Sequence, residues 1–244
     1  MKREVTKITD PIDYPESDGK PMAETDIHRN LLFQLIGALE TVFPESYVSG
    51  NICLYYEEGN PKKMISPDVL LVTRGEPGEK RIFKTWKEAP IDLVIELSSR
   101  KTRKVDYGKK KHIYSSLLKV PWYVIFDPEK LNLEVFRIFG DGYEPVEEDE
   151  EDHYSLSDLG IYISHDPDKR LRLLDHEKNY VLYGDERLDQ ERYRADRESY
   201  RADQERHRAE QERHRAEEEA IQRRLAEEKI KELELLLKRK EEEN

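Results

Sequence analysis

Residues 89–128 read APIDLVIELSSRKTRKVDYGKKKHIYSSLLKVPWYVIFDP, and this stretch decides the fold. It opens with DLVIEL, in which apolar residues alternate with two carboxylates, the pattern of a half-buried strand. Because side chains two or four apart on a strand share a face, Asp92 and Glu96 point the same way. A lysine-rich segment follows, with a helix expected at about 104–118. A second strand is expected at 122–126, so the stretch predicts strand, helix, strand.

The chain before this stretch predicts one helix and two strands. Thr25 or Asp26 can cap a helix that runs to about Val42, because its apolar residues recur every three or four positions. Strands are expected at 47–56 and 64–72. The polar segment that follows them, up to the quoted stretch, reads as a loop.

The chain after this stretch reads as further strands. Residues 133–139 alternate clearly and should form a hairpin with 143–146 across a Gly-Asp-Gly turn. Short strand-like pieces within 154–183 are expected to finish the sheet. The whole order fits an α/β or α+β fold, a mixed β-sheet flanked by helices.

Composition divides the 244 residues into two parts. Residues 1–184 hold nearly all the aromatic and turn-forming residues and can bury a core. Residues 185–244 contain 20 Asp or Glu and 16 Lys or Arg, with no Gly after Gly184. The net charge of −12 argues against a protein that coats DNA non-specifically, but allows a local basic site.

Two further features suggest a cytoplasmic protein. Cys53 is the single cysteine, so no internal disulfide can form, which fits a reducing compartment. The sequence has no apolar stretch long enough to span a bilayer, and its beginning lacks the apolar segment of a signal peptide. We expect no membrane partner.

The tail repeats every seven residues as ERYRADR, ESYRADQ, ERHRAEQ and ERHRAEE, which predicts one long helix. Its early half lacks strong apolar residues for a coiled-coil seam. The later half has the 4-3-4 spacing of such a seam, at Ala226, Ile230, Leu233 and Leu237. We expect a homo-oligomer formed through this helix, and the alternative is a solvated single helix.

Two acidic residues on separate expected strands, Asp68 and Glu96, are candidate ligands for a divalent cation. Hard oxygen ligands suit Mg²⁺, and phosphodiester hydrolysis needs a cation, an activated water and stabilisation of developing charge. Lys110, on the following helix, can supply positive charge. The alternative for Asp68 is an ordinary strand-edge position. Glu96 is harder to explain structurally, because a buried carboxylate is costly unless it is paired or bound to metal.

Four motifs in order resemble the Uma-type family of restriction endonucleases, which belongs to the PD-(D/E)xK nuclease superfamily. They cover about residues 14–145, together with a similar upstream segment at 18–24. The motifs are Pro67-Asp68-Val69, Asp92-Leu-Val-Ile-Glu96-Leu-Ser98, Asp106-x-x-x-Lys110-x-x-x-Tyr114 and Trp122-Tyr-Val-Ile-Phe-Asp127-Pro128. The resemblance implies a restriction-endonuclease-like fold and a Mg²⁺-dependent endonuclease acting on DNA, with Mn²⁺ as a possible substitute.

Carried onto this sequence, the resemblance makes Asp68 and Glu96 catalytic metal ligands. Ser98 stands where the superfamily usually has its lysine, so the lysine is assigned to the helix as Lys110. Lys109 and Lys111 are its neighbours and stay open as alternatives, since only one of three consecutive helical residues can face Glu96 well. Glu24 is a further candidate metal ligand.

The basic run after the first strand is a candidate nucleic-acid-binding surface, because cations beside carboxylates can clamp phosphate. The alternative is a solvated charged face. The candidate residues are Arg100, Lys101, Arg103, Lys104, Lys109 and Lys111.

Two other functions remain open on the sequence. One is a binding or scaffold protein that keeps the nuclease fold and assembles through its helical tail, for which Ser98 and the acidic net charge argue. The other is a nuclease acting on RNA or another phosphoester. Asp92 is equally compatible with a structural role and with a supporting role beside the metal site.

Overall fold

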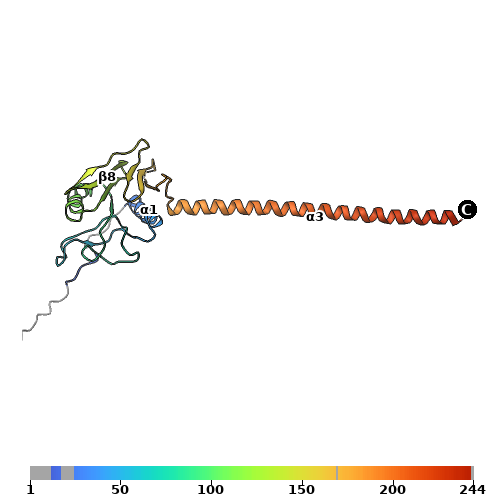
Figure 1. Cartoon of the computed structure of the whole chain (residues 1–244), viewed down its shortest axis with the longest axis horizontal. Coiled ribbons are helices and arrows are strands. Elements are labelled where there is room, and N and C mark those ends of the chain that lie inside the picture. The colour runs from blue at the N-terminus through green and yellow to red at the C-terminus, as the bar shows by residue number, and fades with distance from the viewer. Residues whose placement is uncertain (1–11, 18–24, 169, 243–244) are drawn as a thin grey trace, which may run out of the picture. The chain divides into compact units, whose positions relative to one another are not determined.

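The computed structural model describes residues 12–17, 25–168 and 170–242. The chain separates into two compact units, with the division after Asp185. The first unit contains all the strands, and the second belongs to a single long helix, α3 (Figure 1).

A six-stranded mixed sheet forms the centre of the first unit. Only β6 and β7 run parallel, and the other neighbours pair antiparallel. The helical segment between β6 and β7 is the crossover that a parallel pair requires. The expected fold class, a mixed sheet flanked by helices, is confirmed. In spatial order the strands are β1 (Tyr47–Ser49), β4 (Val69–Val72), β6 (Leu93–Leu97), β7 (Trp122–Asp127), β8 (Asn132–Phe139) and β9 (Gly142–Pro145).

The two long strands expected before the quoted stretch are each broken in two. The second half of the strand expected at 47–56 and the first half of the strand expected at 64–72 leave the central sheet. Together with a third strand they form a small sheet, in the order β3 (Met64–Ile65), β2 (Leu54–Tyr55) and β5 (Phe83–Lys84). The strand β5 lies in the segment expected to be a loop. Pro67 interrupts the second strand because it has no N–H to donate to a ladder.

The first of these two strands is broken at Gly50, where the backbone passes close to the backbone of Asp68. A Cβ on Gly50 would lie 2.4 Å from the carbonyl oxygen of Asp68, so this position excludes side chains. Asn51 follows with φ +53°, and its N–H donates to the carbonyl of Pro67 at 3.0 Å. The contact holds the chain at Asp68 just before β4 begins.

Residues 154–183 do not finish the central sheet, and that expectation is wrong. They form a separate three-stranded antiparallel sheet of β10 (Tyr154–Leu156), β11 (Ile161–His165) and β12 (Leu171–Leu174). The expected strand near Tyr180 is reduced to one isolated bridge with Leu174. The inward residues of this sheet join the core on one face of the central sheet, so it packs as a layer instead of extending an edge.

The first helix, α1 (Asp26–Val42), begins where the capping residue predicts. The side chain of Thr25 accepts a hydrogen bond from the N–H of His28 at 3.3 Å. Leu35 and Leu39 on its apolar stripe are completely buried against the central sheet and β12.

Both faces of β6 are covered, so all five of its residues are buried. Leu93, Ile95 and Leu97 belong to the core shared with α1 and β10–β12. Val94 belongs to the second core, on the other face, with residues of the crossover segment such as Tyr114. Glu96 shares the face of Val94, which places a carboxylate inside the protein.

The crossover between β6 and β7 is helical at the expected position but mostly not an α-helix. It comprises one α-turn, α2 (Arg103–Val105), and two π-helical segments, η1 (Asp106–Lys110) and η2 (Ile113–Leu117). Such wide turns are rare and concentrate at functional sites.

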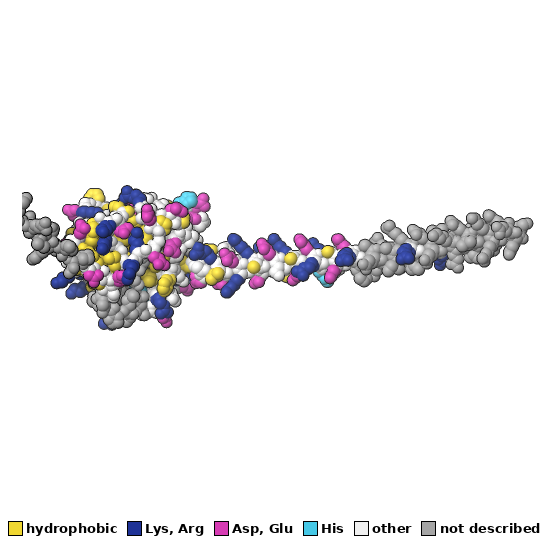
Figure 2. Space-filling model, turned by 90° about the horizontal axis from the view of Figure 1, so that it is seen from below, with side chains coloured by type: hydrophobic (Ala, Val, Ile, Leu, Met, Phe, Trp, Pro, Cys, Tyr) yellow, Lys and Arg dark blue, Asp and Glu magenta, His cyan; other side chains and the backbone are white. Residues whose placement is uncertain are grey.

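The second unit confirms the long helix expected from the seven-residue repeat. Helix α3 spans Gly184–Glu242, and its described side chains from Arg187 onward are all exposed. Figure 2 shows basic and acidic side chains interspersed along its described part. The side chains of Ala226, Ile230, Leu233 and Leu237, the expected seam, lie outside the described residues. Within the described ranges, no helix combines the length and apolarity needed to cross a bilayer.

Candidate active site

Asp68 and Glu96 meet across the antiparallel pair of β4 and β6. The register pairs Val69 with Ile95 and Leu70 with Val94, so one step further sets Asp68 opposite Glu96. Residues directly opposite in such a pair point to the same face, with Cβ atoms about 4.5–5.5 Å apart. The backbone N–H of Leu97 donates to Oδ2 of Asp68 at 2.7 Å, which fixes the carboxylate at this end of β6.

The carboxylate of Glu96 is completely buried and is hydrogen-bonded on both oxygens. Nζ of Lys110 donates to Oε2 at 2.7 Å, and the hydroxyl of Tyr114 donates to Oε1 at 2.9 Å. These two groups therefore hold Glu96 in one orientation. Tyr114 thus contacts the site directly, a role that the sequence did not reveal.

Of the three consecutive lysines, the structure brings Lys110 to Glu96. Its side chain retains 16% exposure, and Nζ also lies 3.8 Å from Oδ1 of Asp106. Lys109 is exposed to solvent. Nζ of Lys111 lies 3.4 Å from the centre of the Phe136 ring, a cation–π contact away from Glu96.

The wide helical turns explain how Asp106, Lys110 and Tyr114 all reach the same site. In an α-helix, a residue four positions along has turned about 40° beyond a full circle, so a row spaced by four drifts around the helix. The i→i+5 turns of η1 and η2 hold more residues per turn and correct this drift. The spacing of four was visible in the sequence, but its alignment depends on these turns.

Asp68 is held in its ionised form. Burial raises the pKa of this carboxyl, but a hydrogen bond from His28, the charge of Lys110 and the Leu97 N–H outweigh it, so the pKa is lowered. Nε2 of His28 lies 3.4 Å from Oδ2 of Asp68. His28 belongs to α1, and only the fold brings it to Asp68.

Glu96 has the opposite tendency. Burial first, and then the nearby charges of Asp68 and Asp106, raise its pKa to about 8 against the pull of Lys110. Lys110 stays charged, because burial lowers its pKa but its acidic neighbours, Glu96 first, raise it more. Among the described residues, these three carboxyl groups thus face one lysine ammonium group, and His28 lies beside Asp68.

Another candidate acid, Asp92, is not part of this arrangement. Asp92 lies at the opposite end of β6, where Oδ2 accepts hydrogen bonds from the N–H and the hydroxyl of Thr73, both at 2.7 Å. These bonds give Asp92 a structural role. Glu24 lies outside the described residues.

The residues of the basic run differ in how exposed they are and in which groups they contact. Arg100, Lys101 and Lys104 are exposed, as is Lys109. Arg103 is partly engaged, because its guanidinium carbon lies 5.3 Å from the centre of the Tyr107 ring and one nitrogen lies 3.9 Å from Asp127. Four of the six candidate residues are therefore free to meet a polyanion.

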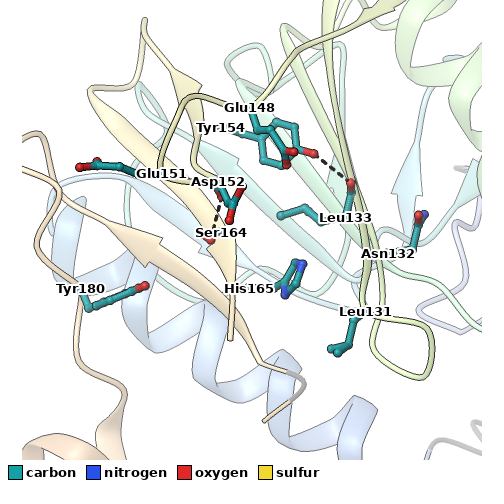
Figure 3. Close-up of a pocket in the computed structure, with 10 residues that line it drawn as sticks. All are labelled: Leu131, Asn132, Leu133, Glu148, Glu151, Asp152, Tyr154, Ser164, His165 and Tyr180. Carbon is teal, nitrogen blue, oxygen red and sulfur yellow. Dashed lines mark hydrogen bonds between the residues drawn. The ribbon is translucent and has the colours of Figure 1, made fainter. Parts of the chain in front are cut away.

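A cavity of about 460 Å³ lies elsewhere, between the start of β8 and β11 (Figure 3). None of the three residues Asp68, Glu96 and Lys110 lines it. Its acidic lining, which includes Glu148 and Asp152, makes it a poor site for phosphate.

The nearby loop holds a cluster of possible metal ligands, Asp149, Glu151 and His153, which is the one such triad among the described residues. Nζ of Lys178 lies 3.0 Å from Oδ2 of Asp149 and 2.6 Å from Oε2 of Glu151. An ammonium group thus already balances these exposed acids. The sequence predicted no metal ligand among these residues.

Comparison with solved structures found similar chains. One similar solved structure is described as a "putative nuclease belonging to DUF820" from Anabaena variabilis ATCC 29413. It shares 16% identity, with a TM-score of 0.43 over 57% of this chain and 76% of that one. No curated protein matches the chain significantly.

The family model described as Uma2, "Putative restriction endonuclease", matches residues 8–163. This match includes the central sheet, the first helix and every residue of the arrangement around Glu96. The chain therefore belongs to the Uma2 family.

Proposed function

We propose that this protein is a Mg²⁺-dependent endonuclease that hydrolyses phosphodiester bonds of DNA, with Asp68 and Glu96 as metal ligands and Lys110 as the catalytic cation. One observation carries the proposal. Glu96 is fully buried beside Asp68 and Asp106, and in the part of the chain that the structure describes Lys110 provides the one ammonium group among these acids. When Glu96 loses its proton, these carboxylates carry more negative charge than Lys110 neutralises, and a divalent cation would balance it.

The donor set fits a hard divalent cation. Asp68 and Glu96 offer carboxylate oxygens, the ligands that Mg²⁺ prefers, and water and phosphate oxygens complete its shell. Such an ion would supply Lewis-acid polarisation of the phosphate. Mn²⁺ accepts the same oxygen ligands.

The chain's own groups have distinct tasks in this proposal. Lys110 remains charged and can donate to the oxygen on which negative charge develops. Tyr114 and the N–H of Leu97 hold the carboxylates of Glu96 and Asp68, respectively, so that neither must reorganise during the reaction. Positioning of this kind accounts for much of the catalysis of phosphoryl transfer in other enzymes.

DNA is the proposed substrate because exposed cations follow Glu96 along the chain. Arg100, Lys101 and Lys104 lie between β6 and η1, within nine residues of Glu96. Contacts of this type recognise the sugar–phosphate backbone and not the base sequence. The phosphate groups on either side of the cleaved bond would lie along this segment.

The proposal is tested with the purified full-length chain and supercoiled plasmid DNA. We expect nicked or linear DNA with Mg²⁺ or Mn²⁺, and no product when EDTA removes the metal. A parallel assay with single-stranded RNA distinguishes the substrate class. If Mg²⁺ raises the melting temperature but neither nucleic acid is cut, the chain is a binding protein that retains the nuclease fold, and the catalytic proposal is wrong.

We also propose that α3 joins copies of the chain through the heptad seam of Ala226, Ile230, Leu233 and Leu237. A helix whose described side chains are all exposed from Arg187 onward gains little from its own unit, and a heptad seam provides a partner surface. The partner is a second copy.

Deleting residues 185–244 is therefore expected to convert an oligomer into a monomer with an intact first unit. Light scattering coupled to size exclusion measures the mass of both forms. A matched variant replaces Leu233 and Leu237 with Glu and keeps the helix length. A monomeric full-length protein would contradict the proposal.

A further inference from the structure

The structure contains a buried acid that the proposed chemistry does not use. Asp106 is 2% exposed, and it begins η1. Its Oδ2 accepts a hydrogen bond from the hydroxyl of Ser98 at 3.0 Å, and its Oδ1 lies 3.8 Å from Nζ of Lys110. Its backbone carbonyl accepts a hydrogen bond from the hydroxyl of Tyr123 at 3.0 Å. Both the side chain and the backbone of this residue are thus anchored.

The position of Lys110 requires such an anchor. A lysine side chain has four flexible carbons and loses about 1.5–2 kcal/mol of conformational entropy when it is held in one place. Glu96 at 2.7 Å draws the ammonium group from the strand side, and Asp106 faces it from its own helical segment. Two carboxylates on different elements define one location for Nζ better than one carboxylate can.

Ser98 connects this pair to the strand. Ser98 lies two residues after Glu96, so the extended chain directs both side chains to the same face. Its own N–H donates to the carbonyl of Phe126 on β7 at 2.7 Å, which makes the serine a rigid part of the sheet. Its hydroxyl donates a hydrogen bond to Oδ2 of Asp106, and Oδ1 is the oxygen that faces Nζ of Lys110.

We propose that Asp106, oriented by Ser98, is the positioning residue that holds the Lys110 ammonium group against Glu96. The inference rests on the proposed function, because it names the residues that make Lys110 useful for the reaction. Asp106 acts through Lys110 and is not a metal ligand in this proposal. Ser98 stands where the superfamily usually has its lysine. In this proposal the serine orients the acid that holds Lys110, the lysine on the helical segment.

The test compares Asp106→Asn, which keeps the shape and removes the charge, with the parent. Asp92→Asn is the matched control, since it makes the same chemical change on a structural acid at the far end of β6. An amine-reactive reagent followed by mass spectrometry measures the modification rate of Lys110, with exposed Lys109 in the same molecule as reference. We expect the Lys110 to Lys109 ratio to rise about fivefold in Asp106→Asn, the scale of losing one ion pair.

The second measurement separates positioning from metal binding. In Asp106→Asn we expect kcat to fall about 10- to 100-fold, the usual cost of losing a supporting contact, with KM for DNA unchanged. The Mg²⁺ concentration that gives half of the thermal shift should stay within about twofold of the parent value. Ser98→Ala should move Lys110 modification and kcat in the same direction, and Ser98→Thr, which keeps the hydroxyl, should restore both.

The outcomes distinguish this inference from the proposed function. Lys110 modification needs no catalysis, so a faster rate in a protein that never cuts DNA would support the positioning role and reject the nuclease. An unchanged Lys110 rate in Asp106→Asn overturns the inference, whether or not the parent cuts DNA. A Mg²⁺ requirement that rises as far as kcat falls also overturns it, because Asp106 would then be a metal ligand.

Discussion

Replacing Glu96 with glutamine is expected to abolish metal-dependent cleavage and to leave the fold intact. Glutamine has nearly the same shape and can still accept the hydrogen bond from Tyr114, but it removes the charge that attracts a cation. We expect kcat to fall at least about 10²- to 10³-fold, the scale of losing one electrostatic contact with the transition state. Plasmid nicking under single-turnover conditions measures the change.

The same substitution should leave the metal-free protein at least as stable as the parent at neutral pH. The parent must bury a carboxyl group whose ionised form is disfavoured there, and the amide avoids that cost. Asp92→Asn is the control, because it should lower stability through its bonds with Thr73 and leave cleavage unchanged. Cleavage by Glu96→Gln at the parent rate would show that Glu96 is not part of the active site.

Binding of Mg²⁺ is expected to tighten steeply as the pH rises to about 8, which is the raised pKa of Glu96. Below this pH the metal must displace the proton on Glu96, so the apparent association constant should rise up to about tenfold per pH unit. Above it the gain should end, because the carboxylate is already ionised. Isothermal titration calorimetry between about pH 6 and pH 9 measures both the constant and the released proton, using buffers of different ionisation enthalpy.

The stability of the metal-free protein should follow the opposite course. The folded pKa of Glu96 lies above its ordinary value of 4.5, so the native state binds more protons than the unfolded state between 4.5 and about 8. Stability is therefore lost as the pH rises through this window, and Mg²⁺ should restore it. The lowered pKa of Asp68 acts at the acidic end and the raised pKa of Lys110 at the alkaline end, outside this window. A pH-independent Mg²⁺ affinity in the parent would contradict the assignment, and Glu96→Gln should show a flatter profile.

The central strand and the helical crossover could be predicted because their signals are local. Alternation marks β6, and the family motif names Asp106, Lys110 and Tyr114 on the next element, although their alignment depends on its wide turns. The approach of Asp68 to Glu96 needs only that two strands pair in register, which the order of the motifs suggested. The structure also brings Lys110, rather than Lys109 or Lys111, to Glu96, as the sequence-based assignment had it.

What could not be predicted depends on contacts between distant parts of the chain. The break at Gly50 follows from the approach of another backbone, which no property of the local sequence reveals. The strands after β9 have ordinary alternation, and only packing against the core decides that they form a layer of their own. His28 lies 40 residues before Asp68, and helix α1 must dock before the two can meet.

The two-sided burial of β6 has a practical consequence for protein engineering. Leu93, Ile95 and Leu97 belong to the core on the face of the sheet that α1 and the layer of β10–β12 cover, and Glu96 faces the other side. Libraries that vary only these three positions could therefore be screened for thermal tolerance with little risk to the acidic cluster. Alternate positions of β6 can thus be varied separately, one set to change thermal stability and the other to change catalytic activity.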